Sequence, residues 1–157
     1  MSRKRWLVLC ATAWGALVGS GSLAAETITV GVGAAYLFAD IQAGIDAAVD
    51  GDTVVVADGT YSGPGNREID FRGKTITVRS AGGAERCQID CEAEACGFLF
   101  HSGESADSIL EGFTIVRGFA ERGGGISFTE NSGPTIVRCV FRDGVADHGG
   151  GGVYVSG

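Results

Sequence analysis

Basic residues are scarce in this 157-residue chain, which has 12 lysines and arginines against 19 aspartates and glutamates and a net charge of -7 at pH 7. Three of the basic residues lie at the very start, in the segment MSRKR. Beyond that segment nine basic residues face the 19 acidic ones, which leaves a net charge of about -10. This acidity argues against nucleic acid or an anionic membrane surface as a partner.

The sequence also lacks an apolar run long enough for a comfortable membrane span. Its most apolar stretch, WLVLCATAWGALVG, follows the basic start and is followed by the small residues of SGSLAAE. This order is typical of a secretory signal peptide, so we predict one over 1–25 and export of the remainder to the periplasm, the cell surface or the medium of a bacterium. An uncleaved anchor is disfavoured because glycines and serines end the apolar run at 19–22.

Proline is nearly missing, with two residues, whereas glycine is abundant, with 27. Because 45% of the chain is hydrophobic, it is too apolar for a disordered glycine-rich linker. Apolar residues alternate within short segments between turn-rich pieces, which predicts strands with one buried face. The predicted strands lie at 53–57, 74–80, 86–90, 97–102, 108–117, 125–129, 134–142 and 152–156.

One segment has a helical period instead. Its apolar residues recur at i, i+4, i+7 and i+8, and they are Ile41, Ile45, Ala48 and Val49. We predict an amphipathic helix of about three turns over 40–50, capped by Asp40 or a neighbour and followed by Gly51 in the left-handed conformation. Residues 26–52 would thus form an N-terminal strand and a capping helix.

The second half of the chain repeats itself at an offset of 26 residues. LEGFTIVRG at 110–118 aligns with IVRCVFRDG at 136–144, and GFAERGGGISF at 118–128 aligns with GVADHGGGGVYV at 144–155. Repeats of this length are the signature of stacked coils. The alignment also stacks Cys139 on Phe113 of the preceding coil, so we expect Cys139 to be a small apolar core residue. It stacks Arg117 on Asp143, and we expect an ion pair between these two residues of adjacent coils.

Apolar pairs continue the same stacking along one side of the chain, and they are Phe98 and Phe100, Ile126 and Phe128, and Val153 and Val155. A right-handed parallel β-helix produces this register, because each strand pairs with its counterpart one coil further on. We therefore predict an all-β solenoid with coils over 53–157. The glycine runs fall at one corner, where positive φ and close backbone approach leave no room for a Cβ.

The string IQAGIDAAVDGDTVVVADGTYSG, followed by KTITVRS, resembles the opening of bacterial right-handed β-helix proteins of the pectate-lyase-like superfamily. The later FRDGVADHGGGGV is similar to the repeats of polymorphic outer-membrane proteins, with Gly144 in place of their asparagine and Gly151 or Gly152 in place of their alanine. The resemblance covers 27–157 and implies the fold. It implies no single activity, because the superfamily contains lyases, hydrolases and adhesins.

The outer side of the predicted Phe98–Val155 sheet carries polar and mixed residues, which are Leu99, His101, Ser127, Thr129, Tyr154 and Ser156. This row has no carboxylate, arginine or lysine. A polysaccharide lyase would be expected to present acids for calcium and a basic residue for proton abstraction there. The row is suited instead to hold a neutral sugar through an aromatic face and hydroxyls.

Two carboxylates, Glu121 and Asp147, stack at the glycine corner, with Arg122 on His148 beside them. They could share a calcium ion with backbone carbonyls, although solvated loop charges are the more common arrangement. The aspartate of nonapeptide calcium repeats does not recur, and no Lys-Ser or Lys-Thr follows the glycines as in a phosphate loop. No cofactor other than this candidate calcium is indicated.

Three cysteines lie close together, at 87, 91 and 96, and export favours disulfides over a metal site. Cys87 and Cys91 would be about 13 Å apart along an extended strand and cannot bond each other. Cys96 can reach Cys91 or, less easily, Cys87. We favour Cys91 with Cys96.

These features predict an exported, non-catalytic β-helix scaffold with a surface, adhesive or carbohydrate-binding role. The alternative is the N-terminal coils of a polysaccharide lyase or glycoside hydrolase whose active site lies beyond residue 157. The sequence ends at GGGGVYVSG, one strand into a coil, so we expect a C-terminally incomplete array. Its exposed rim would self-associate end to end.

Overall fold

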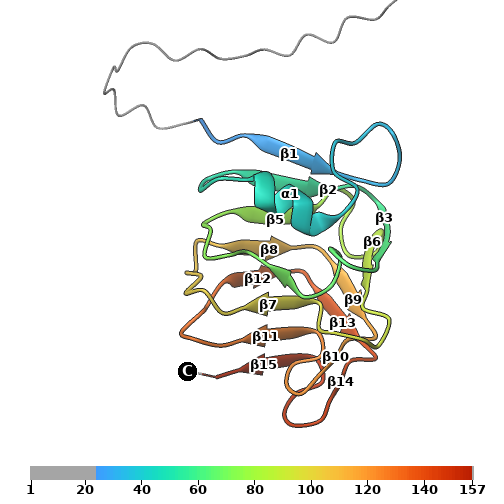
Figure 1. Cartoon of the computed structure of the whole chain (residues 1–157), viewed down its shortest axis with the longest axis vertical. Helices are drawn as coiled ribbons and strands as arrows, with labels where there is room; N and C mark the ends of the chain where they lie inside the picture. Colours follow the sequence, from blue (N-terminus) through green and yellow to red (C-terminus); the bar gives the residue numbers. More distant parts are fainter. Residues whose placement is uncertain (1–23, 157) are drawn as a thin grey trace, which may run out of the picture.

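The computed structural model describes residues 24–156, so nearly all of the predicted signal peptide at 1–25 lies outside the described residues. The described chain is a parallel β-solenoid of about five turns with one short helix near its N-terminal end (Figure 1). The predicted all-β solenoid is confirmed. The described chain has no helix long and apolar enough to cross a membrane.

Three sheets form the walls of the solenoid, and each coil contributes a strand to them in turn. Sheet A runs in the order β1 (Thr27–Val30), β2 (Thr53–Val56), β5 (Thr77–Ser80), β8 (Ile109–Glu111) and β12 (Thr135–Val137). Sheet B runs through β3 (Gly59–Ser62), β6 (Cys87–Asp90), β9 (Thr114–Val116) and β13 (Val140–Arg142).

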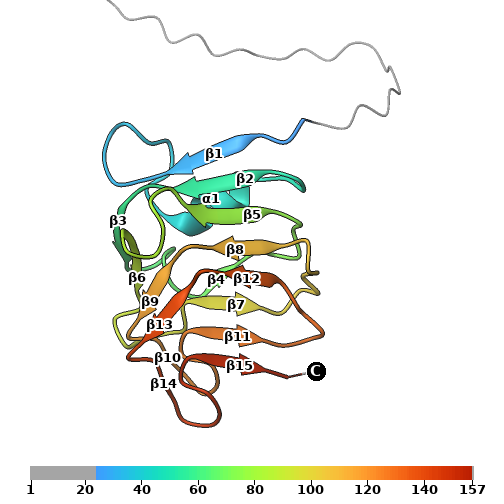
Figure 2. The same cartoon turned by 180° about the vertical axis from the view of Figure 1, so that it is seen from behind.

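Sheet C consists of β4 (Ile69–Asp70), β7 (Phe98–Phe100), β11 (Ile126–Phe128) and β15 (Val153–Val155). A small fourth sheet pairs β10 (Phe119–Ala120) with β14 (Val145–Ala146) at the corner between sheets B and C. Every strand pair is parallel. Figure 1 faces sheet C, and Figure 2 faces sheet A from behind.

The register of the strands matches the predicted stacking. Ile126 pairs with Phe98 on one side and with Val153 on the other. In the other sheets Leu110 pairs with Ile136 at the predicted offset of 26. The offset varies between coils because the connecting loops differ in length, but each strand still pairs in register with its counterpart one coil on. Inward side chains therefore form ladders along the solenoid axis.

Aromatic and aliphatic side chains fill the space between the sheets. The rings of Phe100 and Phe128 stack nearly parallel with centroids 5.4 Å apart, one coil after the other. Cys139 is half-buried and packs against this core, as predicted. Burial decreases toward the last coil, where Val153 is 41% exposed and Val155 is 68% exposed.

The capping helix α1 (Ile41–Ala47) is shorter than the predicted 40–50. Asp40 caps its N-terminus as expected, accepting a hydrogen bond from the Ala43 amide at 2.8 Å. The helix ends at Ala47 because the next residues turn away, and the Asp52 carboxylate holds that turn by accepting the Val49 amide at 2.9 Å.

The predicted C-terminal cap of α1 is also wrong, since the residue after Ala47 has extended backbone. Gly51 does have a φ of 94°, but it lies in the following turn rather than at the helix end. Lys74 takes over the capping, because its ammonium group donates to the carbonyls of Ile45 at 2.7 Å and Ala48 at 2.8 Å.

The glycine corner has the geometry that the repeat predicts. Gly123 has a φ of 69° and Gly149, one repeat later, has a φ of 103°. A Cβ on Gly144 would lie 2.2 Å from the carbonyl oxygen of Gly151, so the two backbone segments meet where no side chain fits. These glycines set how tightly the corner folds.

The predicted ion pair between Arg117 and Asp143 is wrong. Arg117 reaches back to the preceding coil, where its guanidinium donates two hydrogen bonds to the Asp90 carboxylate, at 2.9 and 2.5 Å. Arg117 and Asp143 both have positive φ, at 53° and 54°, so their backbones do correspond. Asp90 is the better partner because its two carboxylate oxygens face both nitrogens of the guanidinium fork.

Candidate functional site

The outer face of sheet C carries a longer polar row than the sequence predicts. Asp70 on β4 pairs in register with Leu99 on β7, which pairs with Ser127 on β11 and then with Tyr154 on β15. The expectation that this row has no carboxylate is therefore wrong. Its physical reason is that β4 is only two residues long, so its sequence shows no clear alternation.

Asp70 and His101 form the main polar contact on this face. The His101 Nε2 atom lies 3.3 Å from the Asp70 carboxylate, and the two side chains are 40% and 22% exposed. The backbone of Asp70 is fixed by Gln42 of α1, whose side chain accepts from its amide at 2.9 Å and donates to its carbonyl at 3.0 Å. The helix thus holds the end of the row in place.

Two neighbouring hollows lie along the outer face of sheet C. The first has a volume of about 620 Å³ and is lined by Gln42, Pro64, Gly65, Arg67, Glu68, Asp70, Arg72, Leu99 and His101. The second has a volume of about 350 Å³ and is lined by Glu68, Cys96, Leu99, Ala120, Glu121, Arg122 and Ser127. Because both linings include Glu68 and Leu99, the hollows adjoin each other on this face, and we call the two together the sheet C groove.

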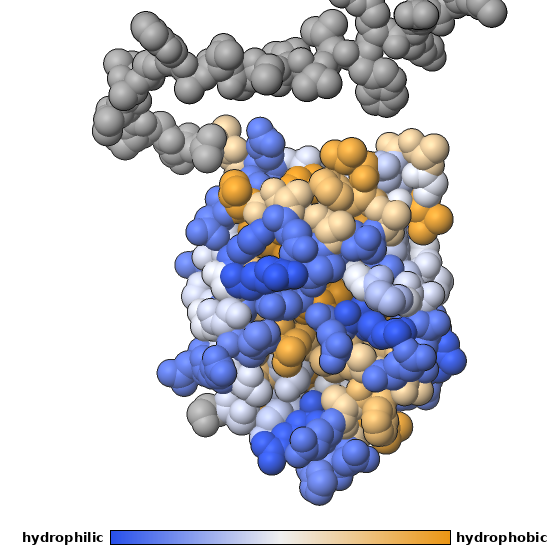
Figure 3. Space-filling view, in the orientation of Figure 1, coloured by the Kyte–Doolittle hydropathy of each residue, from blue (hydrophilic) through white to orange (hydrophobic). Residues whose placement is uncertain are grey.

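The groove runs along the solenoid axis and across successive coils. Its first hollow lies between α1 and β7, and its second lies between β7 and the loop that follows β10. On this face of the molecule, apolar surface is visible between hydrophilic side chains (Figure 3). A groove with an apolar floor and polar walls is suited to an extended, partly polar ligand.

Acidic residues outside the groove neutralise two of its arginines. Arg67 forms ion pairs with Glu92 and Glu94. Arg72 forms one with Asp46 of α1 at 2.8 Å. These contacts fix the guanidinium groups in the wall of the first hollow. Because their charges are already paired, they would attract an anionic ligand only weakly.

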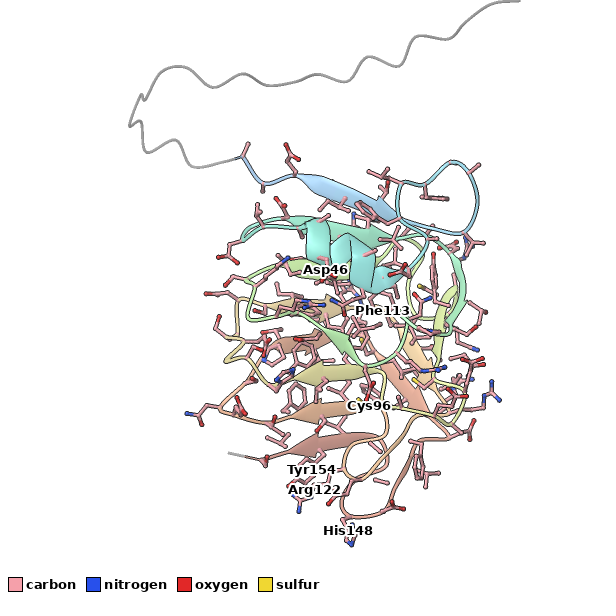
Figure 4. The ribbon with its side chains drawn as sticks, viewed as in Figure 1. Asp46, Cys96, Phe113, Arg122, His148 and Tyr154 are labelled. Atoms are coloured by element: carbon pink, nitrogen blue, oxygen red, sulfur yellow. The ribbon has the colours of Figure 1, made fainter. Side chains whose placement is uncertain are left out.

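Tyr154 at the end of the row is already in contact with Arg122. The guanidinium carbon of Arg122 lies 5.3 Å from the centroid of the Tyr154 ring, and its Nη1 donates to the phenol oxygen at 3.1 Å. The two side chains lie together at the lower end of the solenoid (Figure 4). One face of the ring is thus covered, so the expected stacking of a sugar on it has only the other face.

The structure brings some of the predicted row residues into the groove and leaves others out. Leu99, His101 and Ser127 line it. Thr129 and Ser156 lie beyond the ends of β11 and β15 and line neither hollow, and Tyr154 of β15 lines neither as well. The groove residues before β4 were missed by sequence reasoning.

The two carboxylates of the predicted calcium site lie on adjacent coils. The amides of Asp147 and His148 donate to the carbonyls of Ala120 and Glu121, at 3.2 and 2.7 Å, so the two loops run side by side. Glu121 and Asp147 are both exposed. Within residues 24–156 no group of three or more His, Cys, Asp or Glu side chains is placed to hold a metal ion, and calcium here stays a prediction.

The four cysteines of the described region are free thiols, so the structure contains no disulfide between Cys91 and Cys96. Burial raises the pKa of Cys91 to about 12 and that of Cys96 to about 11. After burial, the charge of Cys96 is the next cause that raises the pKa of Cys91. Their pairing under oxidising conditions stays a prediction.

The fold and the groove define a parallel β-solenoid with a candidate ligand site along one outer face. Comparison with protein-family models, with curated proteins and with solved structures finds no match to this chain. A function for the chain therefore has to be argued from the groove itself.

Proposed function

We propose that this chain is an exported, non-catalytic β-solenoid scaffold whose sheet C groove binds a polysaccharide or a cell-surface glycan. The proposal includes membership of the pectate-lyase-like right-handed β-helix proteins and an adhesive or surface role. Export follows from the basic and apolar start of the sequence and would bring the groove into contact with such polymers.

The observation that carries this proposal is the extension of the groove across successive coils. Neighbouring parallel strands are about 4.8 Å apart, so the part of the row that lines the groove, from β4 to β11, is roughly 10 Å long. The lining alternates an apolar side chain, Leu99, with groups that form hydrogen bonds, Asp70, His101 and Ser127. Sugars have apolar ring faces and hydroxyl edges, and a chain of them matches such a row along its length.

Affinity electrophoresis against a panel of neutral and charged soluble polysaccharides tests the proposal. We expect at least one polymer to retard the protein, and Leu99→Lys to weaken that retardation about tenfold by obstructing the groove floor. Thr60→Lys is the matched control, because Thr60 is exposed on β3 of sheet B, away from the groove. Failure of every polymer to bind, or an equal effect of both variants, would contradict the proposal.

The contact between Asp70 and His101 favours a second candidate, an enzyme that cleaves the bound glycan. A carboxylate that orients an imidazole is a frequent arrangement for proton transfer, and this pair lies in the groove. Screens for lyase and hydrolase products, with and without calcium, separate the two candidates. Turnover that His101→Gln abolishes would favour the enzyme, whereas binding without turnover favours the scaffold.

A further inference from the structure

The second hollow of the groove carries two carboxylates from different coils. Glu68 precedes β4 and Glu121 follows β10, and both line this hollow, which we call the Glu68–Glu121 cleft. Both residues are exposed, and neither side chain forms an ion pair within the described part of the chain. Their negative charges therefore face the cleft without a partner.

The arginines of the groove do not balance these charges. Arg67 and Arg72 are already bound to acidic residues that lie outside the groove lining. Arg122 lines the cleft, but its guanidinium lies over the ring of Tyr154, which is not part of the cleft lining (Figure 4). An anionic ligand would meet two unpaired carboxylates and a single guanidinium held against an aromatic ring.

Ser127 is a second observation at the cleft, independent of the two carboxylates. It is only 7% exposed, it lies on the outer face of β11 between Leu99 and Tyr154, and it lines the cleft. Among the described residues, every fully buried side-chain polar atom has a hydrogen-bond partner. The Ser127 hydroxyl has no hydrogen bond within the protein, so it is not fully buried. This hydroxyl therefore opens into the cleft, where it can bond a ligand.

We propose that the cleft takes the ammonium group of an amino sugar, so the preferred polymer carries free primary amines rather than carboxylates. This inference rests on the proposed glycan-binding function. An ammonium group has three hydrogen-bond donors and forms charge-assisted bonds with carboxylates. Glu68 and Glu121 accept those bonds, Ser127 bonds a ring hydroxyl, and Leu99 packs on the apolar face of the ring.

The same charges set the selectivity of the cleft. A uronate polymer would place its carboxylates against Glu68 and Glu121, and this like-charge contact disfavours binding. An N-acetylated sugar keeps the ring and hydroxyl contacts but has no positive charge. The expected order of affinity is therefore free amine, then N-acetylated, then uronate.

Isothermal titration with three oligosaccharides of equal length tests the inference, namely β-1,4-linked glucosamine, its N-acetylated counterpart and galacturonate. We expect the glucosamine oligomer to bind about tenfold more tightly than the N-acetylated one, and more weakly as salt rises. The double variant Glu68→Gln, Glu121→Gln should lose this advantage, so that it binds the glucosamine oligomer no more tightly than the N-acetylated one. The control is Glu85→Gln, Glu130→Gln, which removes the same charge from two exposed residues outside the groove.

The outcomes separate this inference from the function it rests on. Equal binding of the glucosamine and N-acetylated oligomers would overturn the amine preference and leave glycan binding intact. Binding of none of the three, together with a blank polysaccharide panel, would overturn both. Galacturonate binding that needs calcium and is lost in the double variant would show that the carboxylates hold a metal ion, and it would also overturn the inference.

Discussion

Gly118 and Gly124 meet backbone to backbone within one coil, and a Cβ on Gly118 would lie 1.7 Å from the carbonyl oxygen of Gly124. Gly144 and Gly151 repeat this contact in the next coil, with a corresponding distance of 2.2 Å. The loop between Gly118 and Gly124 carries Ala120, Glu121 and Arg122, which line the sheet C groove. The position of Glu121 therefore depends on glycines several residues away from it.

The first prediction concerns this glycine contact. Gly118→Ala should lower the free energy of unfolding by about 2 kcal/mol or more, because the new methyl group displaces backbone that cannot move aside. Gly133→Ala is the control, since a Cβ there meets no atom within 4 Å. Urea unfolding monitored by circular dichroism measures both, and equal stability of the two variants would refute the close contact.

Glu104 provides a second prediction, on pH dependence. Its carboxylate is buried and accepts from the Gly73 amide at 2.8 Å, the Ser102 amide at 3.1 Å and the Ser132 hydroxyl at 2.8 Å. Burial alone would raise the pKa of this carboxyl, but the hydrogen bonds outweigh burial and lower it. A lowered pKa in the folded state contributes stability that is present above the unfolded pKa of about 4.3.

That contribution should be lost as the pH falls below about 4.3 toward the folded-state pKa. Glu104→Gln should lower the free energy of unfolding by about 1–3 kcal/mol at pH 7. Below about pH 4.3, the free energy of unfolding of this variant should fall less steeply with decreasing pH than that of the wild type. Glu130→Gln, at an exposed position, is the matched control. Unfolding curves at a series of pH values measure the effect, and parallel pH profiles for the wild type and Glu104→Gln would contradict it.

The third prediction concerns the cysteines. When the protein is exported into an oxidising compartment, we expect Cys91 and Cys96 to lose two hydrogens to a disulfide oxidant and form one bond. Intact mass before and after reduction shows this loss, and Cys91→Ser should prevent it while Cys139→Ser does not. Loss of the bond in Cys87→Ser instead would assign it to Cys87 and Cys96, and a fully reduced exported protein would refute the disulfide.

The fourth prediction concerns the last coil of the 157-residue chain. β15 lies at an edge of sheet C, and its own residues Val153 and Val155 are exposed. We expect concentration-dependent self-association through this end, because unpaired strand edges and apolar side chains favour pairing with another copy. Light scattering should show smaller particles for Val153→Lys, Val155→Lys than for the control Thr60→Lys, and a monodisperse wild-type monomer would contradict the expectation.

The sequence predicts the solenoid well because its repeat is visible in the last three coils. Ile126 and Phe128 recur at nearly constant spacing from their counterparts, and constant spacing fixes parallel register. The helix length was harder to predict, because Asp52 also accepts from the Glu26 amide and Lys74 caps the end of α1, and both contacts come from distant parts of the chain. Arg117 illustrates the same limit, since its partner comes from the preceding coil rather than the following one.

The groove was only half predictable from the sequence. Leu99, His101 and Ser127 follow from the alternation of the long strands, but Asp70 lies on a strand of two residues. A signal was present, because Ile69 and Phe71 flank Asp70 as an apolar pair and continue the ladder of Phe98 and Phe100. The arginine contacts and the Glu68–Glu121 cleft depend on loop conformation, which no periodic pattern specifies.

Chemical-shift mapping is the most direct test of glycan binding in the sheet C groove. The backbone amides of the protein would be assigned and titrated with the tightest oligosaccharide from the binding panel. The account predicts shift changes concentrated at 67–72, 97–101 and 120–127, with little change along sheet A or sheet B. Saturable binding whose shift changes fall on sheet A or sheet B, and not on these segments, would contradict it.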